Sequence, residues 1–87
     1  MAKKKTSGKM GLGDTFTANL ILVCEVRNIK YDAVIEYMGM CRATFYDRKD
    51  HHPNKWTAGN IDSAAKLFKI PAGDMTSRML RPEEVVA

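Results

Sequence analysis

The 87-residue sequence lacks any apolar run of about 18 residues, the length at which a membrane-spanning helix is expected. Its longest apolar stretch, residues 20–24, is much shorter, and no apolar segment follows the basic N-terminus as it does in a secretory signal peptide. Only two cysteines are present, Cys24 and Cys41, which are too few for a disulfide framework. The sequence therefore predicts a cytoplasmic protein without membrane contact.

Groups of side chains that perform catalysis are also missing. The chain has no Gly-rich phosphate loop between a strand and a helix, no paired carboxylates, and no Ser-His-Asp or Cys-His constellation. His51 and His52 are adjacent, but with the distant Cys41 they provide neither the spacing nor the number of ligands of a structural zinc site. We therefore expect no enzyme, no metal, no cofactor and no small-molecule substrate.

Acidic residues are absent from the first 13 residues, which contain Lys3, Lys4, Lys5 and Lys9. These lysines account for the whole net charge of +4, because ten basic and ten acidic residues follow from position 14 onward. We expect residues 1–13 to form a flexible basic arm, which at about 3.3 Å per extended residue could follow a groove of duplex DNA. The alternative interpretation is a solubilising tail or a nuclear-type signal.

The rest of the chain has the apolar periodicity of helices. Asp14 or Thr15 is expected to cap the first helix and Thr57 the fourth. Residues 82–87 are expected to be a frayed tail, which leaves one domain at residues 14–81. Five helices are predicted, over residues 14–28, 31–38, 42–50, 58–69 and 71–80.

The two helices on either side of Gly39 have the sequence form of a helix-turn-helix. Val34 and Ile35 give the first of them an apolar face, and glycine suits the turn because it adopts positive φ without a Cβ clash. In the second helix Phe45 is expected to face inward, while the polar side chains around Arg42 remain on the exposed side.

Residues 38–46, MGMCRATFY, resemble the helix-turn-helix of the phage repressor and Cro group, the lambda-repressor-like DNA-binding domains. The resemblance implies a compact five-helix bundle that places helix 42–50 in the major groove of double-stranded DNA and acts as a sequence-specific transcriptional regulator. The chain departs from the group at Lys49, where an apolar residue is usual. Trp56 is therefore expected to anchor the end of this helix as a core residue, the alternative being an exposed stacking platform.

The resemblance also implies which side chains contact DNA. An arginine fork matches the O6 and N7 acceptors of guanine, so Arg42 is expected to read a base. Asp47 could accept from cytosine N4, or it could instead neutralise Lys55 or Arg48. The expected base contacts are Arg42, Ala43, Thr44, Tyr46 and Asp47. The expected phosphate contacts are Lys3, Lys4, Lys5, Lys9, Lys30, Tyr31, Arg48, Asn54, Lys55 and Thr57.

Two further questions stay open on the sequence alone. The neutral body and Asp47 also suit a protein-interaction module, of antirepressor or antitoxin type, built on the same bundle. A weak homodimer is expected from the two-fold symmetry of phage operators. Met75, Met79 and Leu80 would either complete the core or form a small dimer contact.

Overall fold

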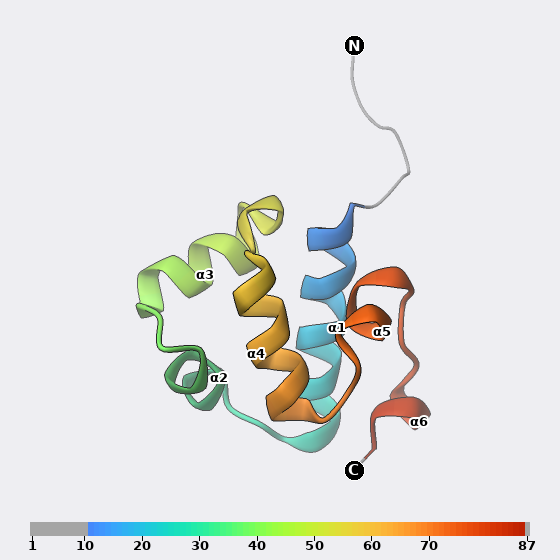
Figure 1. Cartoon of the computed structure of the whole chain (residues 1–87). Helices are drawn as coiled ribbons and strands as arrows, with labels where there is room; N and C mark the ends of the chain where they lie inside the picture. Colours follow the sequence, from blue (N-terminus) through green and yellow to red (C-terminus); the bar gives the residue numbers. More distant parts are fainter. Residues whose placement is uncertain (1–10, 87) are drawn as a thin grey trace.

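The computed structural model describes residues 11–86, and every regular element in this range is a helix (Figure 1). The all-α prediction is confirmed for this part of the chain. The expected contacts of Lys3, Lys4, Lys5 and Lys9 lie outside the described residues. The elements are α1 (Leu12–Arg27), α2 (Tyr31–Met38), α3 (Arg42–Asp50), the 3₁₀ turn η2 (Pro53–Lys55), α4 (Ala58–Phe68), α5 (Ala72–Ser77) and α6 (Pro82–Val85).

Helix α1 supplies the centre of the core. Its side chains Phe16, Leu20 and Val23 are fully buried, and α4, α5 and α6 all pack against this helix. Burying each such side chain stabilises the fold by about 1.5–3 kcal/mol.

The start of α1 differs from the prediction. Gly11 occupies the N-cap position, so neither Asp14 nor Thr15 caps the helix. Asp14 is the third helical residue, and its carboxylate accepts a hydrogen bond of 3.2 Å from the Gly11 N–H. An acid in the first turn is favourable because unpaired N–H groups give this end of a helix partial positive charge. Asp14 therefore stabilises the helix start from inside the helix.

Helices α2 and α3 have the predicted bounds and the predicted glycine turn between them. Gly39 lies in the left-handed region, at φ 69° and ψ 33°, which a residue with a Cβ adopts only at a cost. Its N–H donates to the Ile35 carbonyl at 3.0 Å and so closes α2. Val34 and Phe45 are fully buried on the inner side of the pair. The turn and these apolar contacts fix the direction of α3.

Trp56 covers the core beside α3, as predicted, and is not an exposed platform. Only 7% of it is exposed, and its ring packs edge-on against Phe16 and Phe45, with ring centroids 5.3 and 5.6 Å away. The indole Nε1–H donates to the Thr17 hydroxyl at 2.8 Å. Trp56 therefore contacts α3 through Phe45, in the first half of the helix, and not at the end of the helix as predicted.

The C-terminal part departs most from the prediction. Thr57 caps α4 as expected, but the helix predicted for residues 71–80 is shortened to α5, which an irregular segment follows. Helix α6 lies in residues 82–87, which were expected to be a tail. Val85, in the segment expected to be a tail, is fully buried. Met75 and Leu80 are also buried in the chain's own core, whereas 52% of Met79 is exposed. The three residues therefore do not form one dimer face.

Asn19 accounts for this C-terminal arrangement, and sequence reasoning missed it. The side chain is 1% exposed, and its Nδ2 donates to the carbonyls of Met75 and Arg78, each at 2.9 Å. Its Oδ1 accepts from the Leu80 N–H, also at 2.9 Å. Because buried polar groups need partners, Asn19 stabilises the irregular backbone between α5 and α6. A lone asparagine among apolar residues of α1 was the available signal.

Candidate nucleic-acid interface

The exposed surface formed by the first turns of α2 and α3 contains the residue on which the sequence prediction depends. Arg42 forms an ion pair through Nη1 with the Asp32 carboxylate of α2. The two side chains are 62% and 67% exposed, so Arg42 is not enclosed by its own protein. The Arg42 guanidinium also lies 5.6 Å from the centre of the Tyr46 ring, one turn further along α3. Arg42 is thus held on an open surface by contacts from two helices.

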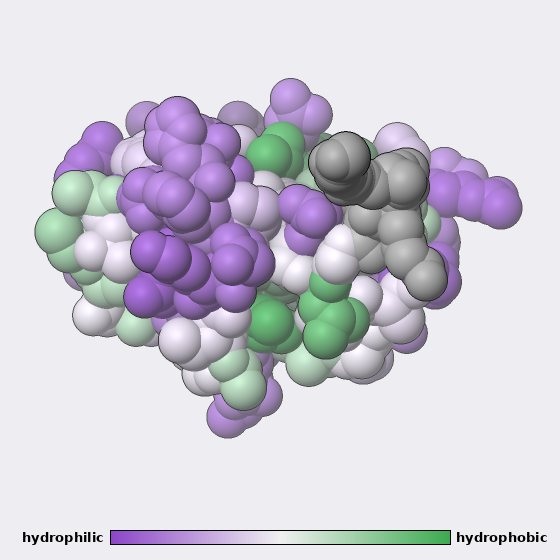
Figure 2. Space-filling view, turned by 90° about the horizontal axis from the view of Figure 1, so that it is seen from above, coloured by the Kyte–Doolittle hydropathy of each residue, from purple (hydrophilic) through white to green (hydrophobic). Residues whose placement is uncertain are grey.

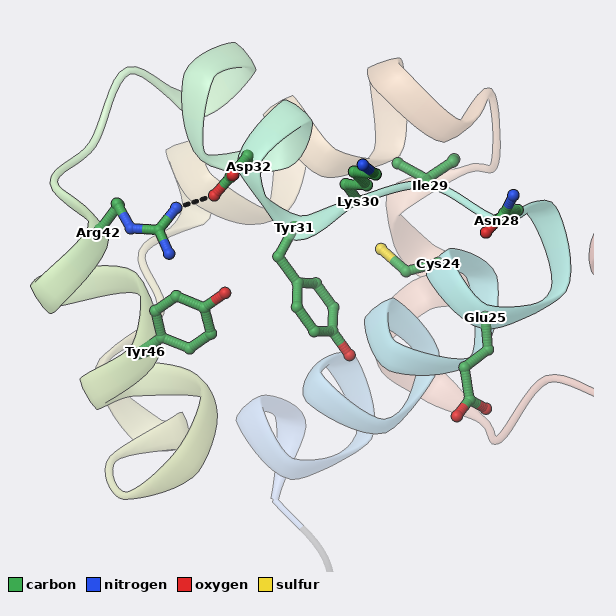
Figure 3. A pocket seen from close by; sticks show the side chains of 9 residues that line it. All are labelled: Cys24, Glu25, Asn28, Ile29, Lys30, Tyr31, Asp32, Arg42 and Tyr46. Carbon is green, nitrogen blue, oxygen red and sulfur yellow. Dashed lines mark hydrogen bonds and ion pairs between the residues drawn. The ribbon is translucent and has the colours of Figure 1, made fainter.

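An open hollow of about 500 Å³ adjoins this ion pair (Figure 3). In the figure the Tyr31 ring of α2 and the Tyr46 ring of α3 lie beside each other, edge to face, with the Arg42–Asp32 pair at one side. Both signs of charge are present, because Lys30 and Arg42 lie there with two carboxylates. The hollow is lined by Cys24, Glu25, Asn28, Ile29, Lys30, Tyr31, Asp32, Arg42 and Tyr46.

Tyr31 was expected to contact phosphate, but its ring is packed inside an aromatic cluster. It meets Phe45 and Tyr46 of α3, with ring centroids 5.9 and 6.2 Å away, and it is half-buried at the edge of the hollow. Burial raises the pKa of the Tyr31 hydroxyl above its ordinary value. The ring of Tyr31 therefore serves mainly to join α2 to α3.

Lys49 belongs to the same cluster. Its side chain is only 12% exposed, and its ammonium lies 4.9 Å from the centre of the Tyr31 ring and 5.6 Å from that of Tyr46. The ammonium also donates to Asp50 at 2.8 Å, and this hydrogen bond is the main reason why the pKa of Lys49 is raised. The aliphatic stem of Lys49 is thus buried beside the two rings, while its ammonium makes cation–π contacts with both.

Two more of the predicted base-contact residues lie at the beginning of α3. Ala43 is exposed and Thr44 is half-buried. The neighbouring Cys41 occupies the N-cap position and is exposed, and the backbone N–H groups of Thr44 and Ala43 lower the pKa of its thiol.

Asp47 has a different partner from either one that the sequence suggested. Both of its carboxylate oxygens lie 3.1 Å from His52 Nδ1, and its carbonyl accepts from the backbone N–H of His51 and of His52. The prediction of a pair with Lys55 or Arg48 was therefore wrong. The loop folds back onto the last turn of α3, which brings His52 to a residue five positions earlier.

Arg48 is also engaged within the protein. Its Nη1 donates to the Asn60 Oδ1 of α4 at 2.6 Å, and the side chain is half-buried. Asn60 is itself part of the α4 cap, since its N–H donates to the Thr57 hydroxyl at 3.0 Å and its Oδ1 accepts from the Thr57 N–H at 3.1 Å. Arg48 and Asn60 thus join α3 to the cap of α4, so the Arg48 side chain is engaged within the protein, whereas Thr57 remains exposed.

Four of the predicted phosphate residues that the structure describes are exposed: Thr57, at the N-cap of α4, and three others. Lys30 precedes α2 at its N-cap position, and Asn54 and Lys55 lie in η2. Figure 2 looks down on the molecule from the top of Figure 1 and shows hydrophilic side chains gathered on one part of this face. The exposed polar residues at the end of α3 and in the following loop are Asp50, His51, His52, Asn54 and Lys55.

Comparison of the chain with protein-family models, curated proteins and solved structures finds no significant match. Among the residues that the structure describes, no helix combines the length and apolar character needed to cross a membrane. Within residues 11–86 there is also no group of three or more His, Cys, Asp or Glu side chains that could hold a metal ion.

Proposed function

We propose that the protein is a sequence-specific double-stranded DNA-binding regulator of the phage repressor and Cro type, with a lambda-repressor-like bundle. The observation that carries the proposal is the position of Arg42. It is exposed at the first turn of a helix that follows a left-handed glycine turn and packs on the preceding helix. An arginine in that place is suited to enter a major groove with its fork toward a base edge.

The side-chain contacts narrow the proposed DNA contacts. Arg42 and Ala43 are the strongest candidates for base edges because both are exposed at the start of α3. Thr44 and Tyr46 are half-buried and adjoin them. For the phosphates, the proposal keeps the exposed Lys30, Asn54 and Lys55 and adds the arm lysines Lys3, Lys4, Lys5 and Lys9. Tyr31, Asp47, Arg48 and Thr57 have internal partners and are assigned positioning roles.

The direct test is selection of bound duplexes from a random library by the full chain. The proposal predicts enrichment of one sequence, present either once or as two half-sites about 10 base pairs apart if two copies bind. Retention of all sequences equally, at every salt concentration tested, would contradict sequence-specific binding.

A protein-interaction module is the second candidate function. It is favoured by the equal numbers of acidic and basic residues from position 14 onward. It is also favoured by two acids at this surface, Asp32, which pairs with Arg42, and Asp47, which lies on α3. A single stoichiometric protein partner in a pull-down, with no DNA retained at low salt, would support this function and exclude the first.

A further inference from the structure

We infer that Asp32 is a positioning residue that orients the Arg42 guanidinium and thereby sets a preference for guanine in the bound DNA. The inference rests on the proposed function and adds to it a residue that was not among the expected DNA contacts. Asp32 is the second residue of α2, whereas Arg42 is the first residue of α3. The side chain that is proposed to read the base therefore belongs to one helix of the motif and is held by a residue of the other.

Two contacts restrain the guanidinium from different sides. Asp32 accepts from Nη1, and the Tyr46 ring centre lies 5.6 Å from the guanidinium carbon. Figure 3 shows the Arg42 side chain extending toward Asp32, with the Tyr46 ring beside it. An exposed arginine without such contacts samples many rotamers, and that freedom is lost when it binds. The two contacts remove part of it before DNA arrives.

The ion pair leaves enough donors for a base. Arginine has five N–H donors in a planar fork, and a guanine takes two of them through O6 and N7. Asp32 occupies Nη1, so donors on Nη2 and Nε remain, and 62% of the Arg42 side chain is exposed. Asp32 can therefore stay paired while the remaining edge of the fork meets a guanine.

Asp32 has a second, opposite effect on binding. Its carboxylate is 67% exposed beside the proposed interface, so it repels the phosphates of any duplex regardless of sequence. Positioning helps only where Arg42 meets a guanine. Removal of the charge is therefore expected to raise the affinity for any duplex and to lower the preference for a guanine-containing one, which a purely repulsive or purely structural residue would not do.

The experiment compares wild type with Asp32→Asn on three DNAs. These are a selected guanine-containing duplex, the same duplex with 7-deazaguanine at each guanine in turn, and a mixed-sequence duplex. We expect affinity for the mixed duplex to rise about 2- to 5-fold at low salt, from the loss of one repulsive charge. The preference for the selected duplex should fall about 3- to 5-fold or more, and the sensitivity to loss of one guanine N7 should shrink.

Two further variants sharpen the result. Asp32→Glu keeps the charge and is expected to restore part of the preference for the selected duplex. Glu83→Gln is the matched control, because it removes an exposed acid that lies 3.8 Å from Arg81, on α6 at the other side of the bundle from α3 (Figure 1). The control should leave the ratio of the two affinities unchanged.

A readout without DNA separates the inference from the proposed function. In the free wild-type chain, nitrogen-15 spectra of the Arg42 guanidinium should show restricted rotation that Asp32→Asn removes. A freely rotating Arg42 in wild type, or equal gains of Asp32→Asn on all three DNAs, would overturn the positioning role while leaving DNA binding intact. Failure of wild type to prefer any duplex would instead overturn the proposed function, and the inference with it.

Discussion

Arg42 is the residue whose replacement has the most specific expected effect. Arg42→Ala should weaken binding to a preferred duplex by about 1–3 kcal/mol, because a bidentate contact with one base is lost. Binding to random duplexes should weaken by only about 2- to 5-fold at low salt, from the loss of one positive charge. The variant should also fold normally, since the Asp32 carboxylate left behind is exposed to water. Titration of both DNAs against both proteins measures the difference, and equal losses on both would remove Arg42 from base reading.

The two cysteines allow a test of the structure that does not depend on DNA. Burial raises the pKa of the Cys24 thiol to about 11, while backbone N–H groups at the start of α3 lower the pKa of the exposed Cys41. Because the thiolate is the nucleophile, alkylation of Cys41 should accelerate with rising pH, with the midpoint of the rise below the ordinary thiol pKa. Cys24 should react slowly throughout this range. Mass spectrometry after iodoacetamide treatment resolves the two sites. Equal alkylation rates of Cys24 and Cys41 in the native protein would contradict the burial of Cys24, whereas equal rates are expected after denaturation.

Among the elements, the turn between α2 and α3 has the sharpest requirement on sequence. Gly39→Ala should destabilise the fold by about 1–2 kcal/mol, because alanine is strained at φ 69° although no atom lies within 4 Å of the added Cβ. Gly73→Ala is the matched control, since this glycine lies in α5, without positive φ and also with open space around its Cβ. Alanine is expected to be neutral or stabilising there. Urea unfolding of both variants tests this, and equal stability changes would be inconsistent with the left-handed turn.

The accuracy of the sequence prediction follows from how local each signal is. The bounds of α2 and α3, the Gly39 turn and the Thr57 cap depend on residues a few positions apart, and the structure has all of them. The break between α5 and α6 was not predicted because its stabilising partner, Asn19, is more than 50 residues away in the sequence. Contacts of that kind depend on which elements become neighbours, and apolar periodicity does not show this.

The distinction between local signals and distant contacts also explains which features of the candidate site were predicted. The exposure of Arg42 at the first turn of α3 follows from the helix-turn-helix pattern, and the structure has it. The partners of Arg48 and Asp47 were missed, because they come from the α4 cap and from a loop that folds back onto α3. The aromatic packing of Lys49 was not predicted, because a charge in that position departs from the apolar residue usual in the group that the sequence resembles. The long stem of a lysine can nevertheless be buried beside two rings.

At the scale of the whole molecule, the net charge is carried by the first 13 residues and not by the rest of the chain. The excess charge of +4 belongs to Lys3, Lys4, Lys5 and Lys9. Replacing all four by alanine should flatten the slope of log affinity against log salt by about 3.6 if each contacts a phosphate. Non-specific binding measured between low and physiological salt provides the slope. An unchanged slope would show that the arm takes no part in binding and would favour the solubilising role.

The central claim is that α3 enters the major groove and that Arg42 meets a guanine there. Methylation interference on a selected duplex tests it most directly, because dimethyl sulfate modifies guanine N7 in the major groove and adenine N3 in the minor groove. We expect methylation of one or two guanines to block binding by the wild-type chain, and Arg42→Ala to lose this sensitivity. Interference only at adenines, or at no base, would contradict the account.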